Sequence, residues 1–239
     1  MDVAGKKALV FGGTSGIGLA TTHQLAERGA QVIAISRDPS KAGDLPAGVS
    51  CEACDVRDRD AMEKLFKQHA PFDILISAAT GGSRALGPFL DMDMDGFAGS
   101  FDKLWGYANV VRYGAGHLTE QGSIVLVSGS PARKAKPGQI ALSSVGGAVE
   151  AMVRALAPEI APKRINTVSP GTIDTPMSAL EGKARDEHFQ KLTAPHLLPR
   201  AGLPDEVAKA IVFMVENDFV TGTTIDAVSY THLTLPTKA

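Results

Sequence analysis

The stretch Val10–Ala20 decides the fold, and it reads Val-Phe-Gly-Gly-Thr-Ser-Gly-Ile-Gly-Leu-Ala. The short apolar run Ala8–Phe11 comes just before its glycines and suits a buried strand, and apolar residues at helical spacing follow as far as Gly29. A strand that enters a helix through a glycine turn points free backbone N–H groups, and the positive end of the helix dipole, at one place. Glycine also lets a pyrophosphate approach the backbone without a Cβ in the way. The stretch therefore predicts a dinucleotide-binding site.

Strands and helices alternate along the rest of the chain, a pattern typical of a parallel, doubly wound sheet. Further strands are expected at residues 31–36, 49–54, 73–77, 123–128 and 164–168, and helices at residues 57–69, 96–118, 140–157 and 205–216. Pro158 is expected to end or kink the helix before it, because proline has no backbone N–H to donate. The stretch 171–200 is polar and poor in helical signals. We therefore predict a single α/β domain with a Rossmann-like sheet.

Composition and charge fit a soluble globular protein. Apolar residues make up 44% of the 239 residues and charged residues 21%, which is enough apolar material to bury a sizeable core. The net charge of −2 gives no reason to expect nucleic acid or an acidic membrane as a partner. No apolar run reaches the roughly 18 residues that span a bilayer, and no charged-then-apolar signal precedes the first strand. The expected location is the cytoplasm.

The two cysteines, Cys51 and Cys54, form a Cys-x-x-Cys pair. A tetrahedral zinc site needs four ligands, and no second pair of Cys or His stands at matching spacing. A redox-active pair usually lies at the start of a helix, whereas these residues fall in the expected third strand. We interpret the pair as structural and expect no metal site.

The order of the glycines resembles that of the short-chain dehydrogenase/reductase family, whose turn runs Thr-Gly-x-x-x-Gly-x-Gly. Gly12, Gly16 and Gly18 match it, with Phe11 in the place of the threonine. The resemblance extends to about Ala227 and implies a nicotinamide dinucleotide held by one set of residues. That set is Gly12, Thr14, Ser15, Gly16, Ile17, Gly18, Arg37, Asp55, Val56, Ala78, Ala79, Pro170, Gly171, Ile173 and Thr175.

Two later segments carry the same resemblance. Asp55 and Val56 follow the third strand, where the family places an aspartate against the adenine amine and an apolar residue beside the ring. Asp55 also suits an ordinary helix cap. The run Ser169–Thr175 matches the family's Pro-Gly segment, in which the backbone at Ile173 and the hydroxyl at Thr175 hold the carboxamide end of the cofactor.

The end of the second strand distinguishes the two nicotinamide cofactors. An acidic residue there binds the ribose hydroxyls of NAD(H), and a basic residue accepts the 2′-phosphate of NADP(H). This chain has Ser36 and then Arg37, whose planar fork suits a phosphate. Asp38 beside it offsets part of the charge, and a plain surface arginine is the alternative. The sequence favours NADP(H) over NAD(H).

The catalytic residues of the family are not found at their expected positions. Relatives use a tyrosine, a lysine four residues later, a serine and an asparagine. The flanking matches put Leu142 at the tyrosine position, Gly146 at the lysine position, Gly129 at the serine position and Lys103 at the asparagine position. The motif after strand four, usually Asn-Asn-Ala-Gly, reads Ser-Ala-Ala-Thr at residues 77–80. Neither leucine nor glycine can move a proton.

Two classes of function follow from this. The first is an NADP(H)-dependent oxidoreductase of small carbonyl or alcohol substrates with a rebuilt site. There Lys103 would project into the space left at Gly146 as a general acid, with Ser128 or Ser130 as hydrogen-bond donor. Tyr107 is a second candidate acid, although core packing suits it better, and a solvated Lys103 is the bland alternative. The second class is a non-catalytic dinucleotide-binding protein, such as a cofactor sensor or a partner subunit.

The resemblance also bears on partners and on the chain's end. Helices 96–118 and 140–157 form the subunit interface in relatives, which implies a homodimer or homotetramer. An anionic substrate fits the basic residues of the loops after strands four and five, although solvated loop charges explain them equally; they are Arg84, Arg133, Lys134 and Lys136. Residues 222–226 resemble the family's last strand. Residues 228–239 resemble read-through of vector or adapter sequence, and we expect the domain to cover residues 1–227.

Overall fold

A computed structural model describes residues 1–43, 45–80 and 84–229. Within them, seven parallel strands form one sheet in the order β3-β2-β1-β4-β5-β6-β7. Their bounds are β1 Lys7–Phe11, β2 Gln31–Ser36, β3 Val49–Ala53, β4 Phe72–Ser77, β5 Leu118–Val127, β6 Arg164–Pro170 and β7 Thr224–Ala227. The strand order reverses between β1 and β4, and ligands of open α/β sheets bind beyond the carboxyl ends of strands at such a reversal. The predicted doubly wound, single-domain α/β fold is confirmed.

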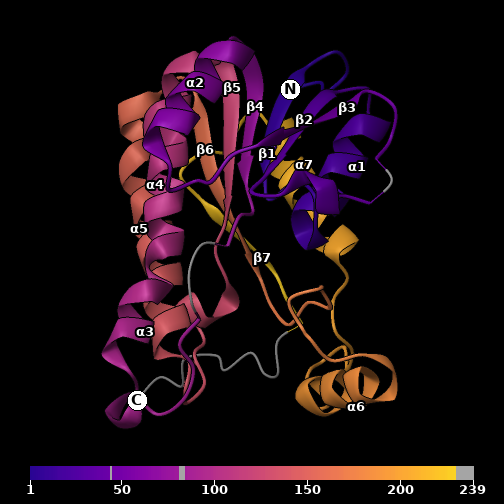
Figure 1. The fold of residues 1–239 in the computed structure, drawn as a ribbon, viewed down its shortest axis with the longest axis vertical. Coiled ribbons are helices and arrows are strands. Elements are labelled where there is room, and N and C mark those ends of the chain that lie inside the picture. Colours follow the sequence, from indigo (N-terminus) through magenta and orange to yellow (C-terminus); the bar gives the residue numbers. More distant parts are fainter. Residues whose placement is uncertain (44, 81–83, 230–239) are drawn as a thin grey trace.

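Helices cover both faces of the sheet (Figure 1). They are α1 Gly16–Glu27, α2 Arg59–His69, α3 Met94–Ser100, α4 Asp102–Gly114, α5 Ile140–Ile160, α6 Gly182–Thr193 and α7 Pro204–Glu216. α2, α4 and α5 lie on one face of the sheet, and α1 and α7 lie on the other. α3 and α6 lie beyond the carboxyl ends of the strands, at the lower left and lower right of Figure 1. The ligand-binding edge of the sheet is therefore the edge that these two helices flank.

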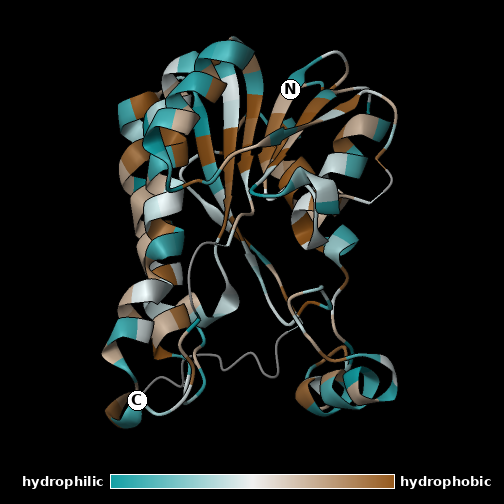
Figure 2. Cartoon of the chain, in the orientation of Figure 1, coloured by the Kyte–Doolittle hydropathy of each residue, from teal (hydrophilic) through white to brown (hydrophobic). Residues whose placement is uncertain are grey.

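The core has two layers, one on each face of the sheet. On the α2–α4–α5 face, the Phe66 ring lies 5.6 Å from that of Phe11 and 5.7 Å from that of Phe72, between centroids. On the other face α1 packs along α7, and Gln24 Nε2 donates to the carbonyl of Asp205 at 3.0 Å. Figure 2 shows the brown of apolar residues along the central strands. Because both faces of the sheet are covered, the strands read as nearly continuous apolar runs in the sequence.

The region 96–118 is not the single long helix that we expected. α3 and α4 meet at Phe101, whose backbone N–H bonds to the carbonyl of Ala98 at 3.0 Å in a tight turn. Asp93 caps α3 by accepting from two backbone N–H groups of its first turn. β5 then begins at Leu118, five residues before the expected strand. The apolar spacing is continuous across Phe101, so the pattern of residues carries no sign of this break.

Two further helices differ from expectation. α5 does not end at Pro158 but runs on to Ile160, with the proline in its last turn, and a kink there stays a prediction. The stretch 171–200 contains α6, which the sequence pattern missed. Thr193 is the only fully buried residue of α6, so this helix carries almost no apolar periodicity.

α5 is also long and apolar enough, by length and composition alone, to cross a membrane, and among the described helices it alone passes that test. The expectation that no segment reaches this limit was therefore wrong. In the fold, α5 places Val145, Val149 and Val153 in the core.

Cys51 and Cys54 are free thiols, the first in the middle of β3 and the second just after it. Cys54 is buried, and burial, together with the nearby Asp58 and Asp55, raises the pKa of its thiol to about 11. A thiol with so high a pKa is unreactive near neutral pH. The described residues contain no cluster of three or more side chains suited to a metal ion.

The end of the chain is described only as far as Ser229. β7 runs over Thr224–Ala227 and pairs with β6, as expected for the family's last strand. Residues 230–239, which make up most of the segment that resembles read-through, lie outside the described residues. The proposed end of the domain at residue 227 stays a prediction.

Candidate functional site

The glycine turn between β1 and α1 leaves no room for a side chain at Gly12 or Gly18. Gly12 has a φ of +78°, and a Cβ on it would lie 2.9 Å from the backbone nitrogen of Ala79. A Cβ on Gly18 would lie 2.0 Å from the carbonyl oxygen of Gly12. Gly16 has a φ of +51°, and the nearest atom to a Cβ there is Thr175 Cβ, at 3.6 Å. The fold thus brings the turn, the residues after β4 and the residues after β6 together.

The start of α1 offers its positive end to an anion. Ser15 is the N-cap residue, and its side chain makes no capping hydrogen bond. The first turn contains no acidic residue. Thr14 before it is buried, and Ile17 in the first turn accepts a hydrogen bond from Thr21 Oγ1 at 2.8 Å. An uncapped helix terminus of this kind, with backbone N–H groups and dipole directed outward, suits a phosphate group.

At the end of β2, Arg37 is exposed and follows Ser36 directly. The neighbouring Asp38 is engaged elsewhere, because it accepts from the Ser40 hydroxyl at 2.5 Å and pairs with Lys41 at 3.1 Å. Ser36 Oγ is buried and has no hydrogen-bond partner among the described residues. The Asp38 carboxylate, which was expected to offset part of the charge of Arg37, is therefore paired with Lys41.

Asp55 and Val56 lie at the carboxyl end of β3. Asp55 Oδ1 accepts the backbone N–H of Arg57 at 2.9 Å. Partial burial acts to raise the pKa of Asp55, but this bond and the Arg57 guanidinium outweigh it and hold the pKa below its ordinary value. Val56 is 7% exposed and packs against α4, where a Cβ on Gly106 would lie 2.6 Å from Val56 Cγ2.

The segment after β6 is joined to two neighbours by backbone bonds. Pro170 ends β6 opposite Ala227, and Gly171 N–H donates to the carbonyl of Ala227 at 3.0 Å. Ile173 forms a bridge with Gly202, and Thr175 is buried. Every residue expected to hold the cofactor therefore lies at or just beyond the carboxyl edge of β1, β2, β3, β4 or β6.

Lys103 lies on α4 and reaches the carboxyl end of β5. Its Nζ donates to the carbonyl oxygen of Ser128 at 3.0 Å and lies 5.5 Å from the centre of the Tyr107 ring. Desolvation, with a smaller contribution from the charge of Arg84, lowers the pKa of Lys103 to about 7. An amine with such a pKa can both release and take up a proton at neutral pH.

Tyr107 belongs to the core. Its side chain is fully buried, and its hydroxyl donates to the carbonyl of Val127 at 2.9 Å. Burial raises the pKa of the phenol well above its ordinary value. The Tyr107 hydroxyl is thus bound to a backbone carbonyl inside the core, and the residue packs as the alternative interpretation expected.

Ser128 belongs to a network of hydrogen bonds and ion pairs, partly buried, that sequence reasoning missed. Ser128 Oγ donates to Glu150 Oε1 at 3.0 Å, and Glu150 is only 4% exposed. Arg133 Nη2 lies 3.6 Å from the same carboxylate oxygen and also pairs with Asp226. A lone acidic residue in the apolar helix 140–157 was the signal that could have revealed Glu150. The network occupies the Ser128 hydroxyl, whose catalytic role stays a prediction.

The open space that we expected beside Gly146 is filled. A Cβ on Gly146 would lie 3.0 Å from Ala132 Cβ and 3.4 Å from the carbonyl oxygen of Gly129. The short helical turn that contains Ala132 packs directly against α5 at this point. The ammonium of Lys103 binds the Ser128 carbonyl, next to Gly129, and its projection into the space beside Gly146 stays a prediction.

Comparisons with known proteins agree with this arrangement. A family model described as enoyl-(acyl carrier protein) reductase matches residues 12–227. The 3-oxoacyl-[acyl-carrier-protein] reductase FabG of Thermotoga maritima is 34% identical over 244 residues, which cover 94% of this chain and 97% of that protein. The chain belongs to the short-chain dehydrogenase/reductase family.

Solved structures of other proteins are similar in fold to this short-chain dehydrogenase/reductase. One is a small-chain dehydrogenase in complex with NADPH, with a TM-score of 0.82 and 29% identity, covering 93% of this chain and 96% of that one. Another is the aldohexose dehydrogenase of Thermoplasma acidophilum, with a TM-score of 0.84 and 26% identity, covering 100% and 99%. The family consists of NAD(P)-dependent oxidoreductases that act on carbonyl and alcohol groups.

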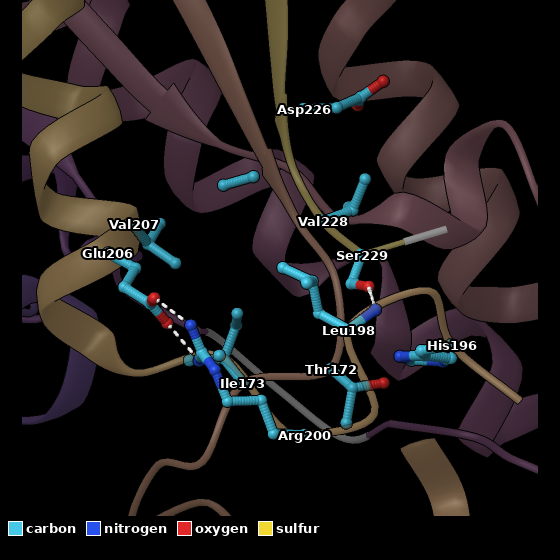
Figure 3. Close-up of a pocket in the computed structure, with 12 residues that line it drawn as sticks. Thr172, Ile173, His196, Leu198, Arg200, Glu206, Val207, Asp226, Val228 and Ser229 are labelled. Carbon is cyan, nitrogen blue, oxygen red and sulfur yellow. Dashed lines mark hydrogen bonds and ion pairs between the residues drawn. The ribbon is translucent and has the colours of Figure 1, made fainter. Parts of the chain in front are cut away.

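This short-chain dehydrogenase/reductase also has a cavity of about 250 Å³, between the segments after β6 and β7 and the start of α7 (Figure 3). On one wall Arg200 and Glu206 form two hydrogen bonds, which lower the pKa of Glu206 to about 2. On another wall the Ser229 hydroxyl accepts the N–H of Leu198 at 2.7 Å. Within each wall these polar groups are therefore paired. Ile173, one of the residues expected to hold the cofactor, also lines the cavity.

Proposed function

We propose that the protein is an NADP(H)-dependent oxidoreductase of small carbonyl or alcohol substrates, with Lys103 in place of the usual proton-transfer residues. The observation that carries this proposal is the position of Lys103. Its ammonium lies at the carboxyl end of β5, bound to the Ser128 carbonyl, and desolvation brings its pKa to about 7. In this proposal Leu142 and Gly146 stand at the tyrosine and lysine positions of the family.

The residues present fit NADP(H). The uncapped start of α1 and the close-packed glycines suit the pyrophosphate. The unpartnered Ser36 hydroxyl and the exposed Arg37 suit the 2′-phosphate, and Thr175 lies against the turn where the carboxamide end would be held. When bound, the cofactor supplies or accepts the hydride. One solved relative contains NADPH, which supports the same choice.

Lys103 would handle the proton. In the direction of reduction, the ammonium donates a proton to the carbonyl oxygen as the carbon gains the hydride, and the neutral amine then regains a proton from solvent. In the direction of oxidation, the neutral amine accepts the proton of the alcohol. The carbonyl of Ser128 holds Nζ in place without taking a proton itself.

The charges near Lys103 favour an anionic substrate. Arg84 lies close enough for its charge to act on Lys103, and its Nη1 lies 3.7 Å from Met177 Sδ. Arg133, by contrast, is already paired with Glu150 and Asp226. We therefore propose that Arg84 binds an anionic group of the substrate, such as a carboxylate, while Lys103 meets the reacting oxygen.

Cofactor preference tests the proposal at Arg37. We expect NADPH to bind at least about tenfold more tightly than NADH, which corresponds to roughly 1.4 kcal/mol. Replacing Arg37 with alanine should remove most of that difference, and calorimetry measures both affinities. Arg28→Ala is the control, because it removes an arginine that pairs with Glu216 at 3.3 Å on another part of the surface. Equal affinities in the unmodified protein would contradict the assignment.

A non-catalytic dinucleotide-binding protein is the second candidate. Two observations favour it: Ala132 fills the space beside Gly146, and the Ser128 hydroxyl is bound to Glu150. Assays of NADPH consumption over a panel of carbonyl compounds, and of NADP⁺ reduction over a panel of alcohols, separate the two candidates. Tight NADPH binding without turnover on either panel would favour a cofactor sensor or partner subunit.

We also propose a homodimer or homotetramer, formed through α4 and α5, in the cytoplasm. Trp105 lies on α4 and is 61% exposed, so a second subunit packed on α4 would cover a large apolar side chain. Trp105→Glu should shift the protein to a monomer in light scattering at micromolar concentration. Phe219→Glu alters an even more exposed ring, beyond the end of α7, and should leave the assembly intact. A monomeric unmodified protein would count against the interface.

A further inference from the structure

Arg185 on α6 uses all its hydrogen-bonding capacity on one short segment. A guanidinium has five N–H donors. Nε donates to Asp174 Oδ1 at 2.9 Å, Nη1 donates to the carbonyls of Ser178 and Leu180 at 3.0 and 2.9 Å, and Nη2 donates to the carbonyl of Thr175 at 2.8 Å and to Asp174. Every donor thus has an acceptor within residues 174–180, the segment that links β6 to α6.

The Arg185 side chain is itself held in place. It is 22% exposed, and its guanidinium carbon lies 5.4 Å from the centre of the Phe189 ring, one turn further along α6. Cation–π contact and the fork of hydrogen bonds fix both the position and the plane of the group. α6 buries only Thr193, and the hydrogen bonds of Arg185 join the helix to the segment.

The same segment meets the candidate cofactor site on its other side. Asp174 N–H donates to the carbonyl of Gly202 at 2.8 Å, and Thr175 lies against Gly16 of the glycine turn. Met177 contacts Arg84 across the site. A shift of residues 174–180 would therefore move Thr175 relative to the turn.

We propose that Arg185 is a positioning residue that holds Thr175 in place for the nicotinamide end of NADP(H), so that α6 and that end of the cofactor are coupled. This inference rests on the proposed function. It predicts an effect confined to one half of the cofactor, because in the proposed function the pyrophosphate and the 2′-phosphate contact the glycine turn and Arg37 instead.

The test compares two ligands on several variants. NADPH carries the nicotinamide, and 2′-phospho-ADP-ribose is the same molecule without it. In Arg185→Met, calorimetry should show NADPH binding at least about tenfold more weakly, with 2′-phospho-ADP-ribose within about twofold of the unmodified protein. Arg185→Lys keeps the charge but has three donors without the planar fork, so it should recover only part of the NADPH affinity.

Lys183→Met is the matched control. Lys183 lies on the same helix, is 87% exposed and pairs with Glu187 at 3.6 Å, so its loss removes a positive charge without touching the segment. NADPH should bind this variant as it binds the unmodified protein. If Arg185→Met does not fold, Arg185→Lys carries the comparison.

Three outcomes would overturn the inference. Equal weakening of both ligands would show a general structural role for Arg185. Unchanged NADPH affinity in both Arg185 variants would show that the segment needs no such support. An unmodified protein that binds neither ligand would overturn the proposed function, and this inference with it, whereas the first two outcomes leave the proposed function standing.

Discussion

Replacement of Lys103 by methionine is expected to lower turnover at least about a hundredfold, the usual scale of a general acid. Methionine keeps most of the stem and removes only the charge, so the packing against Tyr107 is largely kept. NADPH affinity should fall far less than turnover, because Lys103 lies on α4 and the residues expected to hold the cofactor lie on other elements. Lys67→Met, at an exposed surface pair with Glu63, is the control and should leave turnover unchanged.

The pH profile gives a second, independent measurement on Lys103. Reduction needs the protonated amine, so its rate should be flat below pH 7 and fall about tenfold per pH unit above the pKa of about 7. Oxidation needs the neutral amine and should rise up to the same pKa. Because Arg84 contributes to the lowering, Arg84→Met should move both profiles to higher pH. Turnover intact in Lys103→Met, with NADPH binding lost, would instead show that Lys103 only holds the cofactor.

Gly18→Ala is expected to abolish cofactor binding, with at least about a hundredfold loss of NADPH affinity. The added Cβ would lie 2.0 Å from the Gly12 carbonyl oxygen and 2.6 Å from its carbonyl carbon. Both are backbone atoms, so the turn itself must move. The melting temperature should also fall by several degrees, on the order of a core substitution.

Gly147→Ala is the matched control for this change. Gly147 lies inside α5, and no heavy atom of its described surroundings lies within 4 Å of a Cβ added there. Alanine is favoured over glycine in a helix by roughly 0.5–1 kcal/mol, so the melting temperature should hold or rise. Gly18→Ala with normal NADPH affinity would show that the turn is not the binding site.

The centre of the sheet could be predicted from sequence because strands such as β1 and β2 are buried on both faces. Apolar runs such as Ala8–Phe11 and Gln31–Ser36 then mark the strands with little ambiguity, and glycines with positive φ mark the turn. α6 could not be predicted, because it is held by hydrogen bonds from Arg185 and not by an apolar face. Helix-period patterns record burial, and they do not record bonds of this kind.

The candidate site also has one part that could be predicted from sequence and one part that could not. The cofactor residues follow strand ends, so their grouping follows from topology alone. The filling of the space beside Gly146 depends on how the turn with Ala132 packs against α5, which no spacing along the chain encodes. The bond from Ser128 to Glu150 joins two residues 22 apart and depends equally on tertiary structure.

The packing of α1 against α7 has a consequence for synthesis of the protein. Gln24 and Asp205, which join the two helices, are 181 residues apart, so α1 emerges from the ribosome long before its partner. Until then α1 can pack only against the sheet, and contacts so distant in sequence form slowly. The glycine turn at the start of α1 therefore gains the support of α7 only after that helix has been made. A nascent chain that ends before α7 should therefore be unable to hold the dinucleotide.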